Sequence, residues 1–429
     1  MTLNLESVNG PSFAVIHPGS SLHYAVPVVL QQAGMLRAVF TDAHAESAGL
    51  RWLGLLPAAI RPKPLRRMLS RRIPSIIPRT KVRSWIWPSL QVEWCNRTTW
   101  GSSKDSRTLY ERGIGGHWLA EKAIAENFAG ADGLYVRPCI ATDAISAAKR
   151  LGIRVVLETT SHPLNVAVQK AEYEKLGLPP SEAINCLDAN VDFFRKEAVA
   201  VDLVLAASNY VKDGLLELGV KQDRIAVVPY GLNAKFYEKP PDPVPGRVLF
   251  VGMIDPHKGL EYLAGAARQL RTEGFTGEFR AVGPFVCPEV LRHPAFKGLN
   301  YTGPMTRDEV KKEFASADIF VFPTLTDGFG MVLLEALFAG LPIICTPNCG
   351  DVVCDGFNGR VVPSHSSVAL SEAILEVVTN RSRRAEMSRN ALSRVGLFTW
   401  EAYQHRLIDA LRSVFPTNGP DRATFIAVR

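Results

Sequence analysis

The sequence contains little cysteine, no long apolar run and no low-complexity tract. Its 429 residues include seven cysteines, and no stretch approaches the roughly 18 consecutive apolar residues that a membrane-spanning helix requires. Residues 1–12 are polar, which argues against a cleaved secretory signal. Apolar residues make up 47% and charged residues 21%, a composition typical of globular proteins rather than disordered ones. The length predicts two or three domains.

The cysteines are odd in number and scattered, which favours reduced thiols and a cytoplasmic protein. They are Cys95, Cys139, Cys186, Cys287, Cys345, Cys349 and Cys354. The last three are close in sequence, but they form no Cys-x-x-Cys pair and have no histidine at ligand spacing. The sequence therefore predicts no metal site.

Acidic residues are absent from residues 51–90, which contain ten Lys or Arg. The rest of the chain has 39 basic and 42 acidic residues, a net of −3, so the overall charge of +7 is a local feature. Trp52, Trp85 and Trp87 lie among these cations, as expected for contact with an anionic membrane surface or an acidic glycan. Six prolines exclude a long amphipathic helix, and a solvated insertion is the alternative. Nucleic-acid binding is disfavoured because the segment matches no recognised module.

Short Val- and Ile-rich runs alternate with helical patterns along both halves of the chain. We expect strands at residues 13–18, 37–41, 133–136, 154–157, 203–206, 225–230, 247–251, 278–282, 318–322 and 342–345. We expect helices at residues 23–36, 141–151, 209–218, 260–270, 306–315, 331–339, 367–379 and 400–414. Apolar runs with little polar alternation indicate parallel strands covered on both faces. The pattern predicts an α/β protein with two doubly wound sheets.

Residues 239–246 include four prolines and predict a linker between the two halves. The N-terminal domain is then 1–238 and the C-terminal domain 247–396. A terminal helix at 397–415 and a tail at 416–429 complete the chain. Such sheets bind ligands at the carboxyl ends of their strands, so we expect the site between the domains.

Lys258 precedes a predicted helix, where a cation opposes the helix dipole. A bound anion would reconcile the two, because free helix amides and an ammonium group both favour phosphate. The alternative is an exposed lysine beside the turn at Gly259.

A glycine-containing loop and two carboxylates follow the strand at 318–322. Asp327 lies before the helix at 331–339, and Glu335 lies within it among apolar neighbours. A carboxylate on such a helix needs a partner, and the vicinal hydroxyls of a ribose are a suitable one. The alternatives are that Asp327 only caps the helix and that Glu335 forms a structural ion pair.

Together these segments resemble the retaining glycosyltransferases of family 4. The carboxylate pair of that family, separated by seven residues, appears as Asp327-Gly-Phe-Gly330 and Glu335-Ala336. Several other segments are also similar to the family, namely 227–233, 251–259, 340–346 and 398–400. The resemblance is strong from about residue 201 to 403 and diffuse before that.

The resemblance implies the GT-B architecture, in which two Rossmann-like domains face a central cleft. The first domain would lie on the acceptor side, the second would bind the donor, and the terminal helix would cross back to the first domain.

The resemblance also implies roles for individual residues. Glu335 would bind the donor ribose, Lys258 the diphosphate, and Asp327 the transferred sugar. Gly19 would let the backbone approach the phosphates, and His162 would face the sugar unless it is structural. The expected catalytic set is Lys258, Asp327, Glu335 and His162; the expected binding set is Gly19, Gly328, Phe329, Gly330, Met331 and Val332.

Two positions depart from the family pattern. Met253 stands where the family usually has an arginine, so part of the diphosphate charge must be met elsewhere. Asp327 stands where the family usually has a glutamate, which shortens the side chain that reaches the sugar.

The implied activity is a retaining, hexosyltransferase-like transfer from a nucleotide-diphosphate sugar to a glycan or lipid-linked acceptor, in cell-surface polysaccharide or glycolipid synthesis. We expect no cofactor besides the donor substrate and no divalent metal, because Lys258 and helix N-termini would stabilise the leaving phosphate. We expect a cytoplasmic location, with residues 51–90 as the contact to the inner face of the membrane. The alternatives are a nucleotide-sugar epimerase of the same fold and a non-catalytic, membrane-surface binding module.

Overall fold

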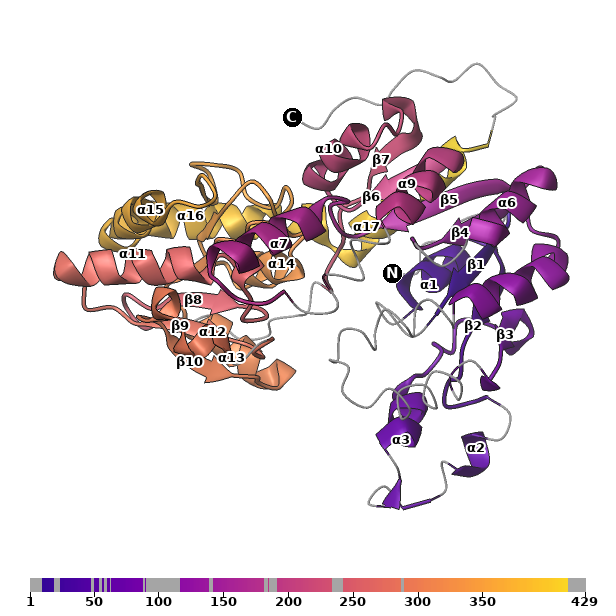
Figure 1. The fold of residues 1–429 in the computed structure, drawn as a ribbon, viewed down its shortest axis with the longest axis horizontal. Coiled ribbons are helices and arrows are strands. Elements are labelled where there is room, and N and C mark those ends of the chain that lie inside the picture. The colour runs from indigo at the N-terminus through magenta and orange to yellow at the C-terminus, as the bar shows by residue number, and fades with distance from the viewer. Residues whose placement is uncertain are drawn as a thin grey trace.

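The computed structural model describes residues 10–18, 24–47, 50–53, 56–57, 60–61, 63–87, 89, 116–138, 142–180, 184, 191–233, 242–286 and 289–415. These residues form two parallel sheets, one from each half of the chain (Figure 1). Gly19, residues 239–241 of the predicted linker and the tail at 416–429 lie outside the described residues.

The first sheet has seven parallel strands in the order β3-β2-β1-β4-β5-β6-β7. The strands are β1 (Phe13–His17), β2 (Leu36–Thr41), β3 (Val82–Ser84), β4 (Gly133–Val136), β5 (Arg154–Thr159), β6 (Leu203–Ala206) and β7 (Ile225–Val227). β1, β4 and β6 are buried along their whole length, as expected for strands with helices on both faces.

The second sheet has six parallel strands in the order β10-β9-β8-β11-β12-β13. They are β8 (Val248–Val251), β9 (Phe279–Val282), β10 (Asn300–Gly303), β11 (Ile319–Phe322), β12 (Ile343–Cys345) and β13 (Gly359–Val361). The strand order reverses between β8 and β11. This is the point at which open α/β sheets bind ligands, beyond the carboxyl ends of the strands.

The helices of the first half include α1 (Ala25–Gln32), α2 (Leu50–Leu53), α3 (Lys63–Ser70), α6 (Thr142–Arg150), α7 (Asn165–Lys175), α9 (Val191–Ala200) and α10 (Asn209–Glu217), and residues 116–125 are also helical. Those of the second half are α11 (Leu260–Thr272), α12 (Glu289–Arg292), α13 (Arg307–Ser316), α14 (Met331–Phe338), α15 (Ser367–Thr379), α16 (Arg381–Arg394) and α17 (Trp400–Ser413). The predicted helix at 23–36 is shorter than expected, because Leu36 already begins β2. Within the described residues, no helix is both long and apolar enough to cross a membrane.

The terminal helix α17 crosses back to the first domain, as the sequence predicts. Arg406 donates a hydrogen bond to the carbonyl of Pro229 at 2.9 Å. Tyr403 and Leu407 of α17 are buried in the same core as Phe13 and Leu205 of the first sheet. Figure 1 shows α17, in yellow, reaching from the second domain to the first. The fold is thus two doubly wound α/β domains joined by a returning helix.

The basic segment, residues 51–90, is folded over part of its described length. It contributes α2, α3 and the edge strand β3, and Figure 1 shows α2 and α3 projecting at the bottom of the view. Trp85 stacks on Phe40 inside the domain, whereas Trp52 and Trp87 are 77% and 62% exposed. Acidic residues elsewhere in the sequence neutralise part of its charge, through the pairs Arg71–Asp42, Arg79–Glu46 and Arg83–Glu126.

Candidate functional site

Lys258 and Asp327 meet where the strand order of the second sheet reverses. Lys258 follows β8 and Asp327 follows β11, and Lys258 Nζ lies 2.6 Å from Asp327 Oδ2. Only 8% of Lys258 is exposed. The other oxygen of Asp327, Oδ1, accepts hydrogen bonds from the amide of Gly330 at 3.2 Å and, at 3.4 Å, from that of Phe329. The carboxylate therefore joins the ammonium group to the N-terminus of α14.

The charge of Asp327 is stabilised by these neighbours. Burial raises the pKa of Asp327, but the Lys258 ammonium and the Gly330 amide lower that pKa further, so the pKa lies below its ordinary value. The Asp327 carboxylate is thus ionised at neutral pH. A ligand with a phosphate and a hydroxyl could replace this ion pair by binding the ammonium through one and the carboxylate through the other.

Local packing fixes the loop that carries Lys258. Asp255 caps the short turn at Pro256–Lys258 and accepts from the His257 amide at 3.1 Å. The carbonyl of His257 accepts from the amide of Leu325 at 2.8 Å, so the loop is bound to the segment after β11. Gly259 has a φ of 68°, and a Cβ there would lie 2.1 Å from the carbonyl oxygen of Pro323. Only glycine fits at this position.

Glu335 lies one turn beyond the start of α14 and is half-buried. Burial raises the pKa of Glu335, and the cations Arg307 and Lys311 of α13 only partly oppose this effect. In the described part of the chain, no hydrogen bond or ion pair reaches the Glu335 carboxylate. The attraction by Arg307 and Lys311 therefore involves no direct contact with the carboxylate among these residues, and the binding of a ribose by Glu335 stays a prediction.

The glycine-containing loop contacts the first domain. The carbonyl of Gly328 accepts from Ser208 Oγ at 2.5 Å, and Thr326 Oγ1 accepts from the hydroxyl of Tyr210 at 3.1 Å. Phe329 is 3% exposed and packs edge-on against Tyr230. The predicted binding residues Met331 and Val332 are half-buried in the first turn of α14. The loops at the carboxyl ends of both sheets therefore meet at Gly328.

Ser208 and Tyr210 were not singled out from the sequence. Ser208 is the N-cap residue of α10 and accepts from the amide of Val211 at 3.2 Å, so its sequence signal is that of an ordinary helix start. Its contact with Gly328 lies 120 residues away along the chain. The pattern of neighbouring residues in the sequence does not indicate a contact between residues so far apart along the chain.

The predicted catalytic His162 is enclosed within its own domain. Its ring stacks on Tyr210 with centroids 4.3 Å apart, and Nδ1 accepts from the amide of Leu164 at 3.2 Å. A Cβ at Gly214 would lie 2.4 Å from Nε2, so the ring rests on α10. Burial lowers the pKa of His162, which favours the neutral imidazole. This geometry supports the structural alternative, and contact with a sugar stays a prediction.

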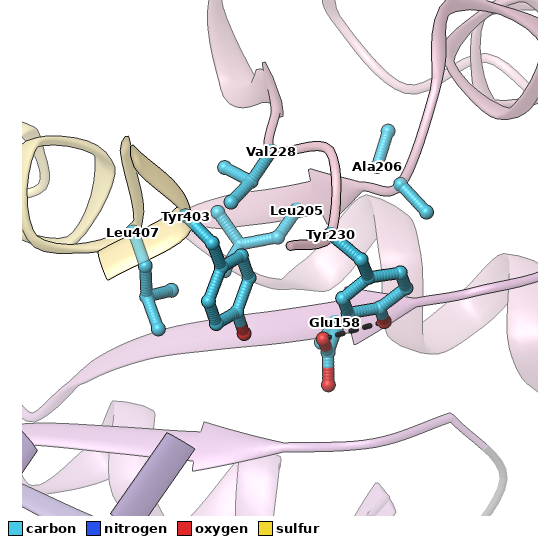
Figure 2. Close-up of a pocket in the computed structure, with 8 residues that line it drawn as sticks. Glu158, Leu205, Ala206, Val228, Tyr230, Tyr403 and Leu407 are labelled. Atoms are coloured by element: carbon cyan, nitrogen blue, oxygen red, sulfur yellow. Dashed lines mark hydrogen bonds between the residues drawn. The ribbon is translucent and has the colours of Figure 1, made fainter. Parts of the chain in front are cut away.

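A second buried polar cluster lies between the first sheet and α17 (Figure 2). The hydroxyl of Tyr230 donates to Glu158 Oε1 at 2.8 Å, and Arg137 Nε lies 3.5 Å from Glu158 Oε2. The hydroxyl of Tyr403, which is also in Figure 2, is buried without a hydrogen-bond partner among the described residues. Burial raises the pKa of Tyr230 and of Tyr403 well above the ordinary value. The pocket that these side chains line has no room for a water molecule.

Comparison with known proteins gives matches in sequence and in structure. Residues 245–380 match the sequence model of the family described as "Glycosyl transferases group 1". An uncharacterized glycosyltransferase of Methanocaldococcus jannaschii is 28% identical over 49% of this chain and 59% of its own length. The D-inositol 3-phosphate glycosyltransferase of Corynebacterium glutamicum is 26% identical over 63% of this chain and 70% of its own length. The chain thus spans less than two thirds of the first relative.

The fold has a counterpart among solved structures. HepE of Anabaena, solved in complex with UDP and glucose, superposes with a TM-score of 0.57 over 94% of this chain and 100% of its own. The two sequences are 14% identical over this alignment. At that identity the likeness establishes the shared architecture of two facing domains and nothing finer.

Proposed function

We propose that this protein is a retaining glycosyltransferase, because residues 245–380 match the glycosyl transferases group 1 model and the chain has the GT-B fold. It moves a hexose from a nucleotide-diphosphate sugar to a glycan or lipid-linked acceptor. The observation that carries the proposal is the Lys258–Asp327 pair, which lies at the N-terminus of α14 where the second sheet reverses its strand order.

Each member of the ion pair interacts with one side of the bond that breaks: Lys258 with the leaving diphosphate and Asp327 with the sugar. Cleavage at the anomeric carbon places negative charge on the leaving diphosphate and positive charge on the sugar. Lys258 turns from Asp327 to the diphosphate and stabilises its developing charge, together with the first amides of α14. Asp327 then accepts from a sugar hydroxyl, and Glu335 accepts from the ribose. Lys258 and the amides at the start of α14 supply the positive charge that a divalent metal would otherwise supply.

Contact between the domains excludes water from the reacting atoms. Ser208 and Tyr210 bind the loop of Gly328 directly beside Asp327. Closure of this kind limits the hydrolysis of an activated donor.

Two substitutions in the site test the proposal. Donors are first found by screening nucleotide sugars for a rise in melting temperature, and transfer is then assayed with the donors that bind. Lys258→Ala and Glu335→Ala should each lower transfer by about 10²–10³-fold, because they remove groups that bind the leaving nucleotide. The matched controls Lys297→Ala and Glu372→Ala change exposed residues of the same domain and should leave transfer unchanged. Wild-type turnover by Lys258→Ala would contradict the proposed role of Lys258.

The same assay separates the other activities. An isomerised sugar formed without any acceptor would indicate an epimerase, and donor binding without turnover on any acceptor would indicate a binding module. Either result would mean that the protein does not catalyse sugar transfer.

We further propose that the basic segment docks the enzyme on an anionic membrane, at its inner face, where a lipid-linked acceptor is presented. Trp52 and Trp87 are exposed, and the exposed cations Arg66 and Arg72 have no carboxylate partner among the described residues.

Vesicle flotation with anionic lipids tests this docking. Replacing Arg66 and Arg72 with serine should reduce the bound fraction. Replacing Arg79 and Arg83, which Glu46 and Glu126 already neutralise, should reduce it less. Equal flotation of the wild type and the first variant would end the membrane hypothesis.

A further inference from the structure

The turn that carries Lys258 holds more negative than positive charge unless His257 is protonated. Three of its side chains are nearly enclosed: Asp255 is 4% exposed, His257 7% and Lys258 8%. With Asp327, the turn contains two carboxylates and one ammonium group, so a neutral His257 leaves a net charge of −1. A protonated His257 brings that net charge to zero. A diphosphate would be repelled by the first state and accepted by the second.

The orientation of His257 is set from both domains. Its Nδ1 is hydrogen-bonded to Asp255 Oδ1, and Asp255 Oδ2 accepts from the buried hydroxyl of Tyr173 at 2.9 Å. Tyr173 belongs to α7, a helix of the first half of the chain that packs on the turn of Lys258. A carboxylate on Nδ1 fixes the tautomer of an imidazole and leaves Nε2 as the reactive nitrogen.

The second ring nitrogen of His257 remains available. In the part of the chain that the structure describes, nothing hydrogen-bonds to Nε2, and Nε2 is not one of the enclosed polar atoms without a partner. His257 and Lys258 are consecutive residues of one three-residue turn, and Lys258 Nζ contacts Asp327 Oδ2 at 2.6 Å. A proton on Nε2 would therefore belong to the same turn as the ammonium group that binds the leaving phosphate.

We propose that His257 is the second cation of the diphosphate site and takes up a proton when the nucleotide binds. This inference rests on the proposed function, because it assigns a further residue to the same donor site. Asp255 and Tyr173 are positioning residues, since they act by holding the imidazole. Charged groups on or bound to this turn are Asp255, Lys258 and Asp327. Two helices that pack on the turn carry further charged groups, namely α7 with Glu172 and Lys175 and α11 with Glu261.

Calorimetric titration of the full chain with UDP, GDP and inorganic diphosphate tests the proposal. Titrations at pH 7.5 in buffers of different ionisation enthalpy give the number of protons taken up on binding. The wild type should take up more protons than His257→Gln, and the variant should bind the probe about tenfold more weakly, as expected for one lost charge-assisted hydrogen bond. His405→Gln, at an exposed position of α17, is the control and should match the wild type.

A second substitution separates charge from folding. Met253 lies in the same loop and is 47% exposed, so an arginine fits there. Met253→Arg in the His257→Gln background should restore affinity but not proton uptake, because arginine keeps its charge at every accessible pH. Tyr173→Phe should lower affinity less than His257→Gln.

The outcomes are distinct. Wild-type affinity and proton uptake in His257→Gln would overturn the role of His257 and leave the proposed function standing. Failure of the arginine to restore affinity would also overturn it, since the lost binding would then not be a matter of charge. If none of the three probes bound to the wild type, the proposed function would fail, and this inference with it.

Discussion

Replacing Gly328 with alanine tests the contact on which domain closure depends. A Cβ at Gly328 would lie 1.5 Å from the carbonyl oxygen of Thr160, where ordinary contacts begin near 3.4 Å. The atoms that this Cβ would meet, in Thr160 and Ser161, belong to the backbone, so they cannot rotate away as a side chain would. The loop and the first domain must therefore separate by about 2 Å, since packed interiors have no spare space.

The size of the effect follows from the hydrogen bonds at this contact. A separation of this size breaks the bond from Ser208 to Gly328 and the bond from Tyr210 to Thr326. At about 0.5–1.5 kcal/mol each, their loss disfavours the closed arrangement by about 1–3 kcal/mol. We expect sugar transfer to fall by about 5- to 150-fold, since each 1.36 kcal/mol is a factor of ten in rate. The alanine keeps the amide of residue 328, so a lost amide donor cannot explain the fall.

The assay combines transfer kinetics with small-angle scattering. Gly328→Ala should be slower and should have a larger radius of gyration than the wild type, while its circular dichroism is unchanged. Gly396→Ala is the matched control, because a Cβ there meets no atom within 4 Å. If Gly328→Ala kept the wild-type rate and radius, the two domains would not meet at this loop during the reaction.

Two further predictions concern buried polar groups outside the site. Burial raises the pKa of Glu261 well above its usual value, and the nearby Glu172 carboxylate adds to the effect. The folded protein then binds a proton that the unfolded chain releases near pH 4.5, so stability falls as pH rises from there through the folded pKa. Glu261→Gln should accordingly stabilise the protein by about 1–2 kcal/mol at pH 8 and by less at pH 5 in urea unfolding; a pH-independent difference would contradict this. In the cluster of Figure 2, Tyr230→Phe removes a buried hydrogen bond to Glu158 and should cost about 1–3 kcal/mol, whereas Tyr403→Phe removes an unpartnered hydroxyl and should be neutral or stabilising. If the two phenylalanine variants lost the same free energy of unfolding, the Tyr403 hydroxyl would also make a hydrogen bond, which would contradict this prediction.

The sequence predicted those parts of the fold whose residues are buried on both faces. Strands such as β6 and β11 are continuous apolar runs, and their ends locate the carboxyl edge of each sheet. The approach of Lys258 and Asp327 follows from that rule, because they lie in the loops that follow two neighbouring strands, β8 and β11. The ion pair between them could not be read from the sequence, since nothing in it specifies the direction of either side chain.

The elements that the sequence analysis missed have weak or divided patterns. Edge strands β10 and β13 are only partly buried, so they have few apolar residues to mark them. Helix α16 buries only Met387 and Ala391 in its 14 residues. Helix α7 contacts both domains and buries the polar Glu172 as well as Tyr173, so its apolar residues do not form a single stripe. Hydrophobic periodicity predicts a helix that buries one face, and it fails for a helix that packs against two domains.

The return of α17 to the first sheet affects the order in which the chain can fold. The ring of Phe13, the first residue of β1, packs edge-on against Phe415 with centroids 5.7 Å apart. During synthesis, the part of the N-terminal sheet that α17 covers therefore stays exposed until residues 400–415 have been made. All strands of the second sheet precede α17, so that sheet can close before the first is fully covered, although multidomain proteins usually fold from the N-terminus. A fragment that ended before Trp400 would expose apolar side chains of the first sheet and should aggregate.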